Sequence, residues 1–496
     1  MTKPKKLVVL NLSILALSVF FANPSFGLIV DQWILDNVPA AEETPQDVLE
    51  QIPNALGGEK VAKHGLSQRQ LIRLGEFIFN NVTFGGNGRT CATCHPATNN
   101  FTIDPGYIAN LPPDDPLFVA ENIPALAELE KPALMRQFGL IVENLDGFNE
   151  EGVMRGVIST LALRTSITPE EGFLPQSSIG WSGDGAPGNG SLREFAIGAV
   201  IQHFPKTLYR EPGVDFRLPT ELELDALLAF QLSLGRQAEL NLAEMRFRSP
   251  VVERGKELFD SKEEGTGKCK GCHNNAGANS STTLKNGNRD TGVEMLPDQP
   301  ARLVDPTIPC DRGFGTEPWD KPCNGDSCCG FGDGTFNITT VVEAADTPPF
   351  FHNNSVNTIE EAVAFYNSDA FNTSPASEDR KIHLETTQIM AVAAFCRAIN
   401  ALENIRNSNK LDSDAKRAGI LRGKRILAIA ISDTEDAIEV LLGGKYALYE
   451  GTAIKNLDQA LLFERLARVA NKRDMRNRLI DRAIAEKNDA RDLIVE

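Results

Sequence analysis

The sequence predicts a mainly α-helical protein, with two tandem helical domains, long irregular loops and a C-terminal helical extension. Two observations support this prediction. Two stretches of the chain repeat the same order of helix, turn and cysteine motif, and the last part interleaves charged residues with Leu, Ile and Ala at helical spacing. A length of 496 residues is too great for one ordinary core and fits several domains.

The composition narrows the class of protein. The chain is 42% hydrophobic and 24% charged, as globular proteins are. Its formal net charge is −17, from 67 acidic and 50 basic residues. Because affinity for phosphate backbones needs clustered Lys and Arg, we expect no nucleic-acid partner.

The first residues are typical of a secretory signal. Lys3, Lys5 and Lys6 precede a nearly continuous apolar run over 7–22, and a small residue, Gly27, ends a plausible cleavage site. We therefore expect residues 1–27 to be a signal peptide and the mature chain to be periplasmic or otherwise exported. The run is short for a membrane span, so we expect no integral span after removal of the signal, with a retained N-terminal anchor as the alternative.

The internal repeat is the main evidence for two domains. Both stretches have a helix start, a Gly and a Phe four residues apart, and a Cys-x-x-Cys-His pentapeptide. These features are Ser67–Gln70, Gly75, Phe79 and Cys91–His95 in the first stretch, and Ser249-Pro250, Gly255, Phe259 and Cys269–His273 in the second. Each half also has a later amphipathic helix, with Ala229-Phe230 at 221–234 and Ala394-Phe395 at 386–402.

The repeat divides the chain into segments. We expect a signal peptide at 1–27, a lead-in at 28–64, a first cytochrome c-like domain at 65–240, a second at 241–405 with a Cys-rich loop at 310–329, and a helical extension at 406–496. The extension has no Cys or His, and we expect it to be a packing extension or cap.

Cys-x-x-Cys-His is the attachment signature of c-type haem. Two thiols one helical turn apart bond to the two vinyl groups of one porphyrin, and the adjacent imidazole then coordinates the iron. A zinc site needs a second ligand pair, and a thioredoxin-like pair does not need the histidine. We expect two covalently attached haems, held by Cys91, Cys94 and His95 and by Cys269, Cys272 and His273.

With these motifs in place, the sequence resembles the bacterial di-haem cytochrome c peroxidase family, which includes MauG. The likeness covers roughly residues 65–405 and rests on three segments: 74–102, Gly180-Trp181-Ser-Gly-Asp-Gly185, and 347–366 from Thr347-Pro-Pro-Phe-Phe-His352 to Ala-Phe-Tyr366. The resemblance implies that the first haem reacts with hydrogen peroxide. It implies that the second exchanges electrons with a small redox protein donor or a protein substrate.

Individual roles also follow from the resemblance. Trp181 stands at the position of a tryptophan between the haems, and Tyr366 at the position of the second haem's sixth ligand. A tyrosinate ligand favours ferric iron, whereas a thioether favours ferrous iron. The alternative is that Tyr366 is a packing aromatic and that Met295 or Met390 ligates instead.

The sequence departs from the family at the first haem. Peroxidases of the family cleave the O–O bond with a distal glutamate, but the matching stretch, 196–206, contains no acid. His203 is the titratable residue there near neutral pH, and it has three possible roles: structural residue, acid–base group or haem ligand. If the missing acid ends the peroxide chemistry, the alternative function is a non-catalytic di-haem electron carrier.

The remaining residues complete the expected sites. His352 lies in the best-matched segment, which implies a role in a haem pocket or at a propionate. Thr347 and Pro349 match positions that help to hold an interhaem calcium in the family, but the expected asparagine partner is not visible in 150–165, so calcium stays open. We expect Cys310, Cys323, Cys328 and Cys329 to form two disulfides, and Cys396 to be a buried free thiol. The oligomeric state is not predicted.

Overall fold

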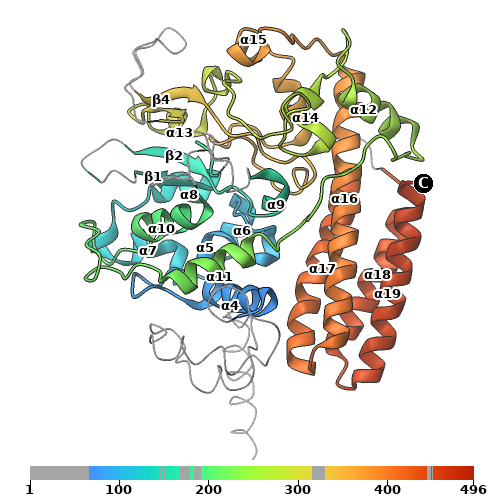
Figure 1. Cartoon of the computed structure of the whole chain (residues 1–496), viewed down its shortest axis with the longest axis horizontal. Coiled ribbons are helices and arrows are strands. Elements are labelled where there is room, and N and C mark those ends of the chain that lie inside the picture. Colours follow the sequence, from blue (N-terminus) through green and yellow to red (C-terminus); the bar gives the residue numbers. More distant parts are fainter. Residues whose placement is uncertain are drawn as a thin grey trace, which may run out of the picture.

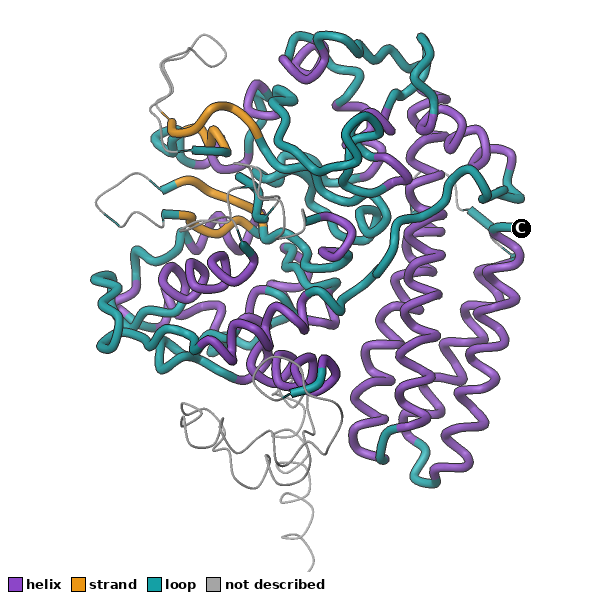
Figure 2. Tube along the Cα trace, in the orientation of Figure 1, coloured by secondary structure: helices purple, strands orange, loops and turns teal. Residues whose placement is uncertain are grey.

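The computed structural model describes residues 66–144, 148, 152–167, 179–183, 191–315, 330–443, 448–449 and 451–496. The predicted signal peptide and lead-in, and Cys323, Cys328 and Cys329, lie outside the described residues. The described part is mainly helical, as predicted, and two small sheets lie on the side of the view opposite the long C-terminal helices (Figures 1 and 2). No helix in this part is both long enough and apolar enough to cross a membrane.

The first half consists of three longer helices and several short ones. Its elements are α4 (Gln68–Asn81), α5 (Cys91–Cys94), α6 (Pro105–Ala109), α7 (Val119–Asn122), α8 (Pro132–Phe138), β1 (Leu140–Glu143), β2 (Val153–Gly156), α9 (Leu163–Ser166), α10 (Leu192–His203) and α11 (Glu221–Gln231). The predicted capping box at Ser67 is present: its hydroxyl accepts from the Gln70 amide, and the Gln70 side chain accepts from the Ser67 amide.

The second half and the extension follow. Their elements are α12 (Pro250–Asp260), α13 (Pro300–Val304), β3 (Cys310–Gly313), β4 (Gly330–Thr335), α14 (Ile359–Phe365), α15 (Asp369–Asn372), α16 (Thr386–Arg417), α17 (Ile420–Leu442), α18 (Ala453–Val469) and α19 (Arg473–Ile494). Short 3₁₀ turns lie at Ala97–Asn99, Pro116–Phe118, Pro124–Leu126, Cys269–Gly271, Asn274–Ala276, Val293–Met295 and Pro375–Ser377.

The two small sheets were not expected from the sequence. β1 pairs antiparallel with β2, and β3 pairs parallel with β4. A buried ion pair joins the sheets, because Arg155 of β2 donates to both carboxylate oxygens of Asp311 of β3, at 2.5 and 2.9 Å. Each strand is too short to show a clear period of two, which explains why the pattern did not reveal it.

The repeated Gly and Phe residues form the same helix crossing twice. In the first half α4 crosses α11, and in the second half α12 crosses α16. A Cβ at Gly75 would lie 1.9 Å from the Ala226 carbonyl oxygen, and a Cβ at Gly255 would lie 1.9 Å from the Ala391 carbonyl oxygen. Glycine therefore lets the two helix backbones touch at equivalent points.

Phenylalanines fill both crossings in the same way. Phe79 meets Phe230 with ring centroids 5.2 Å apart, and Phe259 meets Phe395 at the same distance. Both pairs belong to buried cores, and Cys396 lies beside Phe395 as the predicted buried free thiol, 2% exposed. The duplication read from the sequence thus has a counterpart in the packing of each half.

The extension is a bundle of long helices, α16–α19, at the right of Figure 1. Helix α16 runs without a break across residue 405, where the sequence analysis placed a domain boundary. Its first turns carry the apolar face that packs on the second half, and its later turns pack on α17 and α19. The extension therefore shares a helix and a hydrophobic core with the second half.

The bundle also contacts the first half, at the loop after the first pentapeptide. Ser432 of α17 donates a hydrogen bond to the Thr98 carbonyl oxygen at 3.0 Å, and Asn100 donates to the carboxylate of Asp436 at 3.2 Å. Near the other end of the bundle the chain terminus returns to the second half. The Arg248 amide donates to the Ile494 carbonyl oxygen, and the Glu496 amide donates to the Arg246 carbonyl oxygen.

Candidate functional site

The first pentapeptide forms one helical turn. Thr90 caps α5, and the His95 amide closes the turn on the Cys91 carbonyl oxygen at 3.0 Å. Cys91 and Cys94 are therefore held one turn apart and are only half-buried. The turn places both thiols and the histidine at the same cavity, because all three line it.

The His95 ring is oriented by the backbone. Its Nδ1 lies 2.8 Å from the Phe101 carbonyl oxygen, which only accepts, so Nδ1 carries the hydrogen and Nε2 is left as a ligand. Asn100 and Phe101 reach this position with φ of 52° and 54°, in the left-handed region. Burial lowers the pKa of His95, which favours the neutral imidazole that a metal requires.

The second pentapeptide repeats this arrangement. The His273 amide donates to the Cys269 carbonyl oxygen at 2.8 Å, and Nδ1 lies 3.0 Å from the Gly277 carbonyl oxygen. Two left-handed residues, Asn275 and Ala276, again bring the loop back to the ring. The backbone angles match as well, with φ −123° and ψ 60° at His95 against φ −117° and ψ 61° at His273.

The thiols are not poised for disulfide exchange. Burial raises the pKa of Cys91 to about 12 and that of Cys94 to about 11. In the second pentapeptide burial raises the pKa of Cys269 to about 12. Redox-active Cys-x-x-Cys pairs have lowered thiol pKa values, so these pairs do not fit a thioredoxin-like function.

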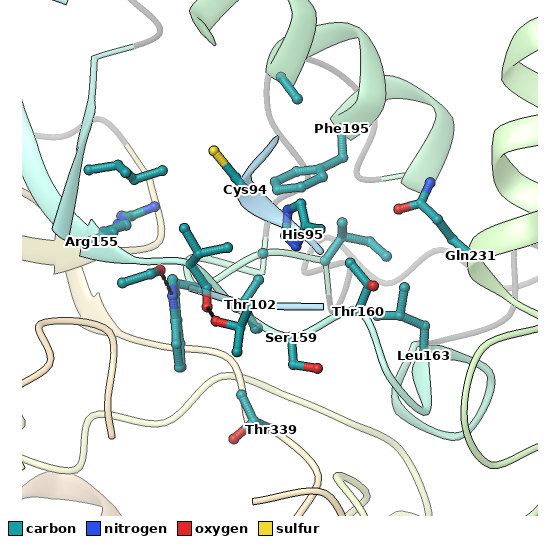
Figure 3. Close-up of a pocket in the computed structure, with 18 of the residues that line it drawn as sticks. Cys94, His95, Thr102, Arg155, Ser159, Thr160, Leu163, Phe195, Gln231 and Thr339 are labelled. Carbon is teal, nitrogen blue, oxygen red and sulfur yellow. Dashed lines mark hydrogen bonds between the residues drawn. The ribbon is translucent and has the colours of Figure 1, made fainter. Parts of the chain in front are cut away.

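A cavity of about 260 Å³ opens beside the first pentapeptide (Figure 3). Figure 3 shows His95 beside Phe195 of α10, with Thr160 and Thr339 on other walls. Residues of the second half complete the lining, among them Asn337, Thr339, Thr340, Glu343 and Thr347. The backbone of Thr339 also hydrogen-bonds to His273, so one short segment touches both the cavity and the second histidine.

Trp181 lies in the wall of this cavity, between the two halves. Its indole Nε1 donates to the Gly156 carbonyl oxygen at 2.7 Å, and its own carbonyl oxygen accepts from the Asn337 amide at 2.8 Å. The indole ring also lies edge-on to the His352 ring, with centroids 6.4 Å apart. Its position between the halves fits the predicted bridge, although its redox role stays a prediction.

His203, the last residue of α10, lines the same cavity. Burial and the nearby positive charges of Arg89 and Arg210 lower its pKa to about 3. Its Nδ1 lies 4.0 Å from a carboxylate oxygen of Glu130. A neutral histidine in this cavity fits an acid–base group or a ligand, and the choice among the three roles stays open.

His352 lies in a buried polar cluster outside the lining of the cavity. Its Nε2 is 2.6 Å from the carboxylate of Glu294, and its ring stacks on Phe336 with centroids 3.7 Å apart. Its carbonyl oxygen accepts from the Gly156 amide at 2.7 Å, which ties it to the Trp181 wall. The predicted haem-pocket role is not tested by this placement.

Tyr366 ends α14 close to the second pentapeptide. Its ring packs against Phe365 and Phe371, with centroids 5.3 and 5.1 Å away. Burial and the thiols of Cys272 and Cys269 raise the pKa of its phenol, which places the side chain near both cysteines. Met295, one of the alternative ligands, is 38% exposed.

Several site residues gave no signal in the sequence. Arg89 is 1% exposed and donates to Glu130 at 2.8 Å, just before the first pentapeptide. Glu343 lines the cavity from the second half of the chain. Arg89 and Glu343 are recognised as site residues only by their neighbours in the folded structure, which sequence motifs do not reveal.

The predicted calcium ion and the two predicted disulfides remain predictions. In the described part of the chain no cluster of three or more His, Cys, Asp or Glu side chains is arranged to hold a metal ion. Thr347 and Pro349 line the large cavity, and calcium there stays a prediction. Cys310 is buried, but the other three cysteines of its loop lie outside the described residues, so the two disulfides also stay a prediction.

Comparisons with known proteins give a distant likeness only. No protein-family model matches the chain, and no curated protein matches it. Among solved structures, the chain is similar to the crystal structure of a MauG-like protein associated with microbial copper homeostasis. The two are 14% identical with a TM-score of 0.34, over 73% of this chain and 93% of that chain.

Proposed function

We propose that the chain is an exported di-haem c-type cytochrome of the peroxidase/MauG type, with one haem in each half. Cys91, Cys94 and His95 hold the first haem. The main support is that both pentapeptides fold alike, with Nδ1 of each histidine held by a backbone carbonyl oxygen, as in metal-ligating histidines.

The residues around the first pentapeptide fit a haem. The thiols lie one turn apart for two thioether bonds, and Phe79, Leu192, Phe195 and Ala199 give the cavity apolar walls for a flat macrocycle. When bound, haem supplies an iron centre for peroxide and electron chemistry. The chain itself anchors the ring through the thiols, fixes His95 through the Phe101 carbonyl, and keeps His203 neutral in the cavity.

The second haem is proposed to exchange electrons with a small redox protein donor or a protein substrate. Cys269, Cys272 and His273 hold it, and Tyr366 is its sixth ligand. The contact of the Thr339 backbone with His273 and the position of Trp181 support a short path between the two sites. Hydrogen peroxide is the proposed substrate at the first haem.

A di-haem electron carrier without peroxide chemistry is the second candidate. One observation favours it: the helix that faces the first cavity, α10, supplies His203 but no acid to that cavity. In this candidate His203 would be a second protein ligand of the first haem, which would then be closed to peroxide.

The deciding experiment combines haem counting with reaction with peroxide. The purified wild-type protein is expected to carry two haems, and the Cys91→Ser/Cys94→Ser variant one, by absorbance and intact mass. The matched control, Cys396→Ser, changes a buried thiol outside the pentapeptides and is expected to keep both. Wild-type protein without covalent haem would overturn the proposal.

Peroxide then separates the two candidates. Addition of hydrogen peroxide to the ferric protein is expected to change the haem spectrum if the first haem is open. Two low-spin haems that do not respond to peroxide would favour the carrier. Export is checked by the N-terminal sequence of the mature protein, expected to begin near residue 28, in a periplasmic fraction.

A further inference from the structure

Glu343 is a buried carboxyl group without a partner. Its side chain lies in the loop between β4 and α14, is 5% exposed, and makes no hydrogen bond or ion pair with any other described residue. It lines the large cavity beside the first pentapeptide and also a second, smaller cavity. Gly235, at φ +61°, packs directly against it: a Cβ there would lie 3.0 Å from Oε1 of Glu343.

Like charges surround this carboxyl group. The groups that act on Glu343 are Asp346 in its own loop, Glu403 and Arg406 of α16, and Asp433 of α17. Glu403 is already paired with Arg236 and Arg406, so its charge is compensated. Burial and the neighbouring carboxylates raise the pKa of Glu343 well above its usual range. Both effects favour the protonated form of this carboxyl group.

The smaller cavity connects Glu343 to the bundle. Its volume is about 20 Å³, enough for one water molecule, and its polar lining is Asn100, Glu343, Asn404, Asn407 and Asp433. A water at this position has several hydrogen-bonding partners within reach. Glu343 therefore has a polar neighbour on the side away from the large cavity.

From the small cavity the acids continue towards solvent along α17. Asp433 accepts from Asn407 at 2.6 Å and is coupled electrostatically to Asp346. Asp436, one helical turn further on, is half-buried and accepts from Asn100. Burial and the neighbouring carboxylates raise the pKa of Asp346 to about 6 and that of Asp436 to about 9.

We propose that Glu343, Asp433 and Asp436, the interface acids, form a proton-entry path from the surface of the bundle, through the small cavity, into the cavity of the first haem. The inference rests on the proposed function, because reduction of one H₂O₂ to two H₂O takes up two protons and two electrons. The electrons come from the one-electron donor protein named above, and the protons enter from solvent through Asp436 and leave Glu343 into the cavity. Glu343 then regains a proton through the small cavity.

The proposed path gives the C-terminal extension a role in proton transfer in addition to its role in packing. Two of the three interface acids, Asp433 and Asp436, belong to α17, and two amides that line the small cavity, Asn404 and Asn407, belong to α16. It also supplies an acid to a cavity whose facing helix, α10, has none there. The acid comes from the second half of the chain rather than from the segment where the family places one.

The first test reads the proton itself. Infrared spectra of the holoprotein at pH 7 are expected to contain a carbonyl band of a protonated carboxylic acid that disappears in Glu343→Gln and persists in Glu343→Asp. The matched control is Glu435→Gln, an exposed acid of the same helix as Asp433. Transfer to D₂O shifts the band, and Asp436→Asn is expected to slow that shift if Asp436 is the entry point.

Turnover with peroxide is the second readout. Glu343→Gln is expected to slow peroxide reduction about 10²-fold, with partial recovery in Glu343→Asp and none of this in Glu435→Gln. An unchanged band and an unchanged rate in Glu343→Gln would overturn the path. Loss of the band on addition of Ca²⁺, with a rise in Tm, would also overturn it, because the cluster is then a cation site.

The two proposals fail differently. Wild-type protein with two haems that does not react with peroxide at any pH contradicts the proposed function, whereas the band and its exchange still report on the path. Wild-type protein that reacts with peroxide, together with a Glu343→Gln variant that keeps the band, its exchange and the rate, contradicts the path alone.

Discussion

The side chains of Tyr366 and of the two pentapeptide histidines are held in place by different interactions. A backbone carbonyl fixes the orientation of His95 and His273, whereas the Tyr366 ring is held by packing against Phe365 and Phe371. Its phenol lies near the thiols of the second pentapeptide, as a ligand to a haem there would. The assignment can be tested by removing one oxygen atom.

Tyr366→Phe is expected to change the spectrum of one haem and to raise its reduction potential, because loss of a tyrosinate ligand removes a preference for ferric iron. The ring and its packing are retained, so the Tm is expected to change little. Redox titration followed by absorbance measures both effects. Met295→Leu and Met390→Leu are the controls. An effect of either methionine variant, with none in Tyr366→Phe, would assign the ligand to methionine.

Among individual residues, the sequence predicts those that haem attachment requires at a fixed spacing. The pentapeptides and the buried thiol Cys396 could be named from local pattern alone. Glu343 could not, because its significance comes from residues far away in the chain, such as Asn100 and Asp433. Arg89 was missed for the same reason, since its partner Glu130 is also distant in the sequence.

At the scale of elements, the duplicated crossing of α4 with α11 and of α12 with α16 has the strictest geometry. Gly75 and Gly255 each lie against a carbonyl oxygen of the facing helix backbone, which cannot move aside as a side chain can. The two helices of each pair also carry the phenylalanines that cover the pentapeptides. A change at either glycine should therefore act on one half of the molecule.

Gly75→Ala and Gly255→Ala are each expected to destabilise the protein by roughly 1–3 kcal/mol, since the added methyl forces two helices apart. Thermal unfolding of the holoprotein measures the loss. Gly419→Ala, which has no atom within 4 Å of the added Cβ, is the control; it lies at the N-cap of α17 and is expected to cost less than about 1 kcal/mol. Alanine favours a helix interior over glycine, so an unchanged or higher stability in Gly75→Ala and Gly255→Ala would contradict the close packing.

The helices were predictable because their starts have local signals, such as the capping boxes at Ser67 and Thr358. The sheets were not, because their strands are short and Gly-rich. The length of α16 was also not apparent from the sequence: the helix continues past residue 405 to Arg417 because its apolar residues pass from one packing partner to another without a helix stop signal.

At the scale of the whole molecule, many buried acids hold protons that they would release on unfolding. Burial raises the pKa of Glu76 and of Asp412 to about 7, and burial with neighbouring carboxylates raises that of Asp436 to about 9. These groups favour the folded state when protonated, and this contribution is lost as the pH rises through their folded pKa values. The buried histidines act in the opposite direction, but only below pH about 6.5.

The Tm is therefore expected to fall between pH 7 and pH 9, where the buried acids with raised pKa values lose their protons. Calorimetry of the holoprotein over this range checks the slope. Asp436→Asn is expected to make the slope shallower, whereas Asp492→Asn, at an exposed position near the end of α19, is expected to leave it unchanged. A Tm that rises over this range would contradict the assignment of protonated acids in the folded chain.

The closing contact of residues 494–496 with residues 246–248 has a consequence for the order in which the protein is made. Residues 246–248 precede α12 and are synthesised long before their partners, which lie at the end of α19. The segment before α12 therefore cannot complete its hydrogen bonds until α19 has been made. Removal of residues 494–496 is expected to expose the segment at 246–248 to proteases.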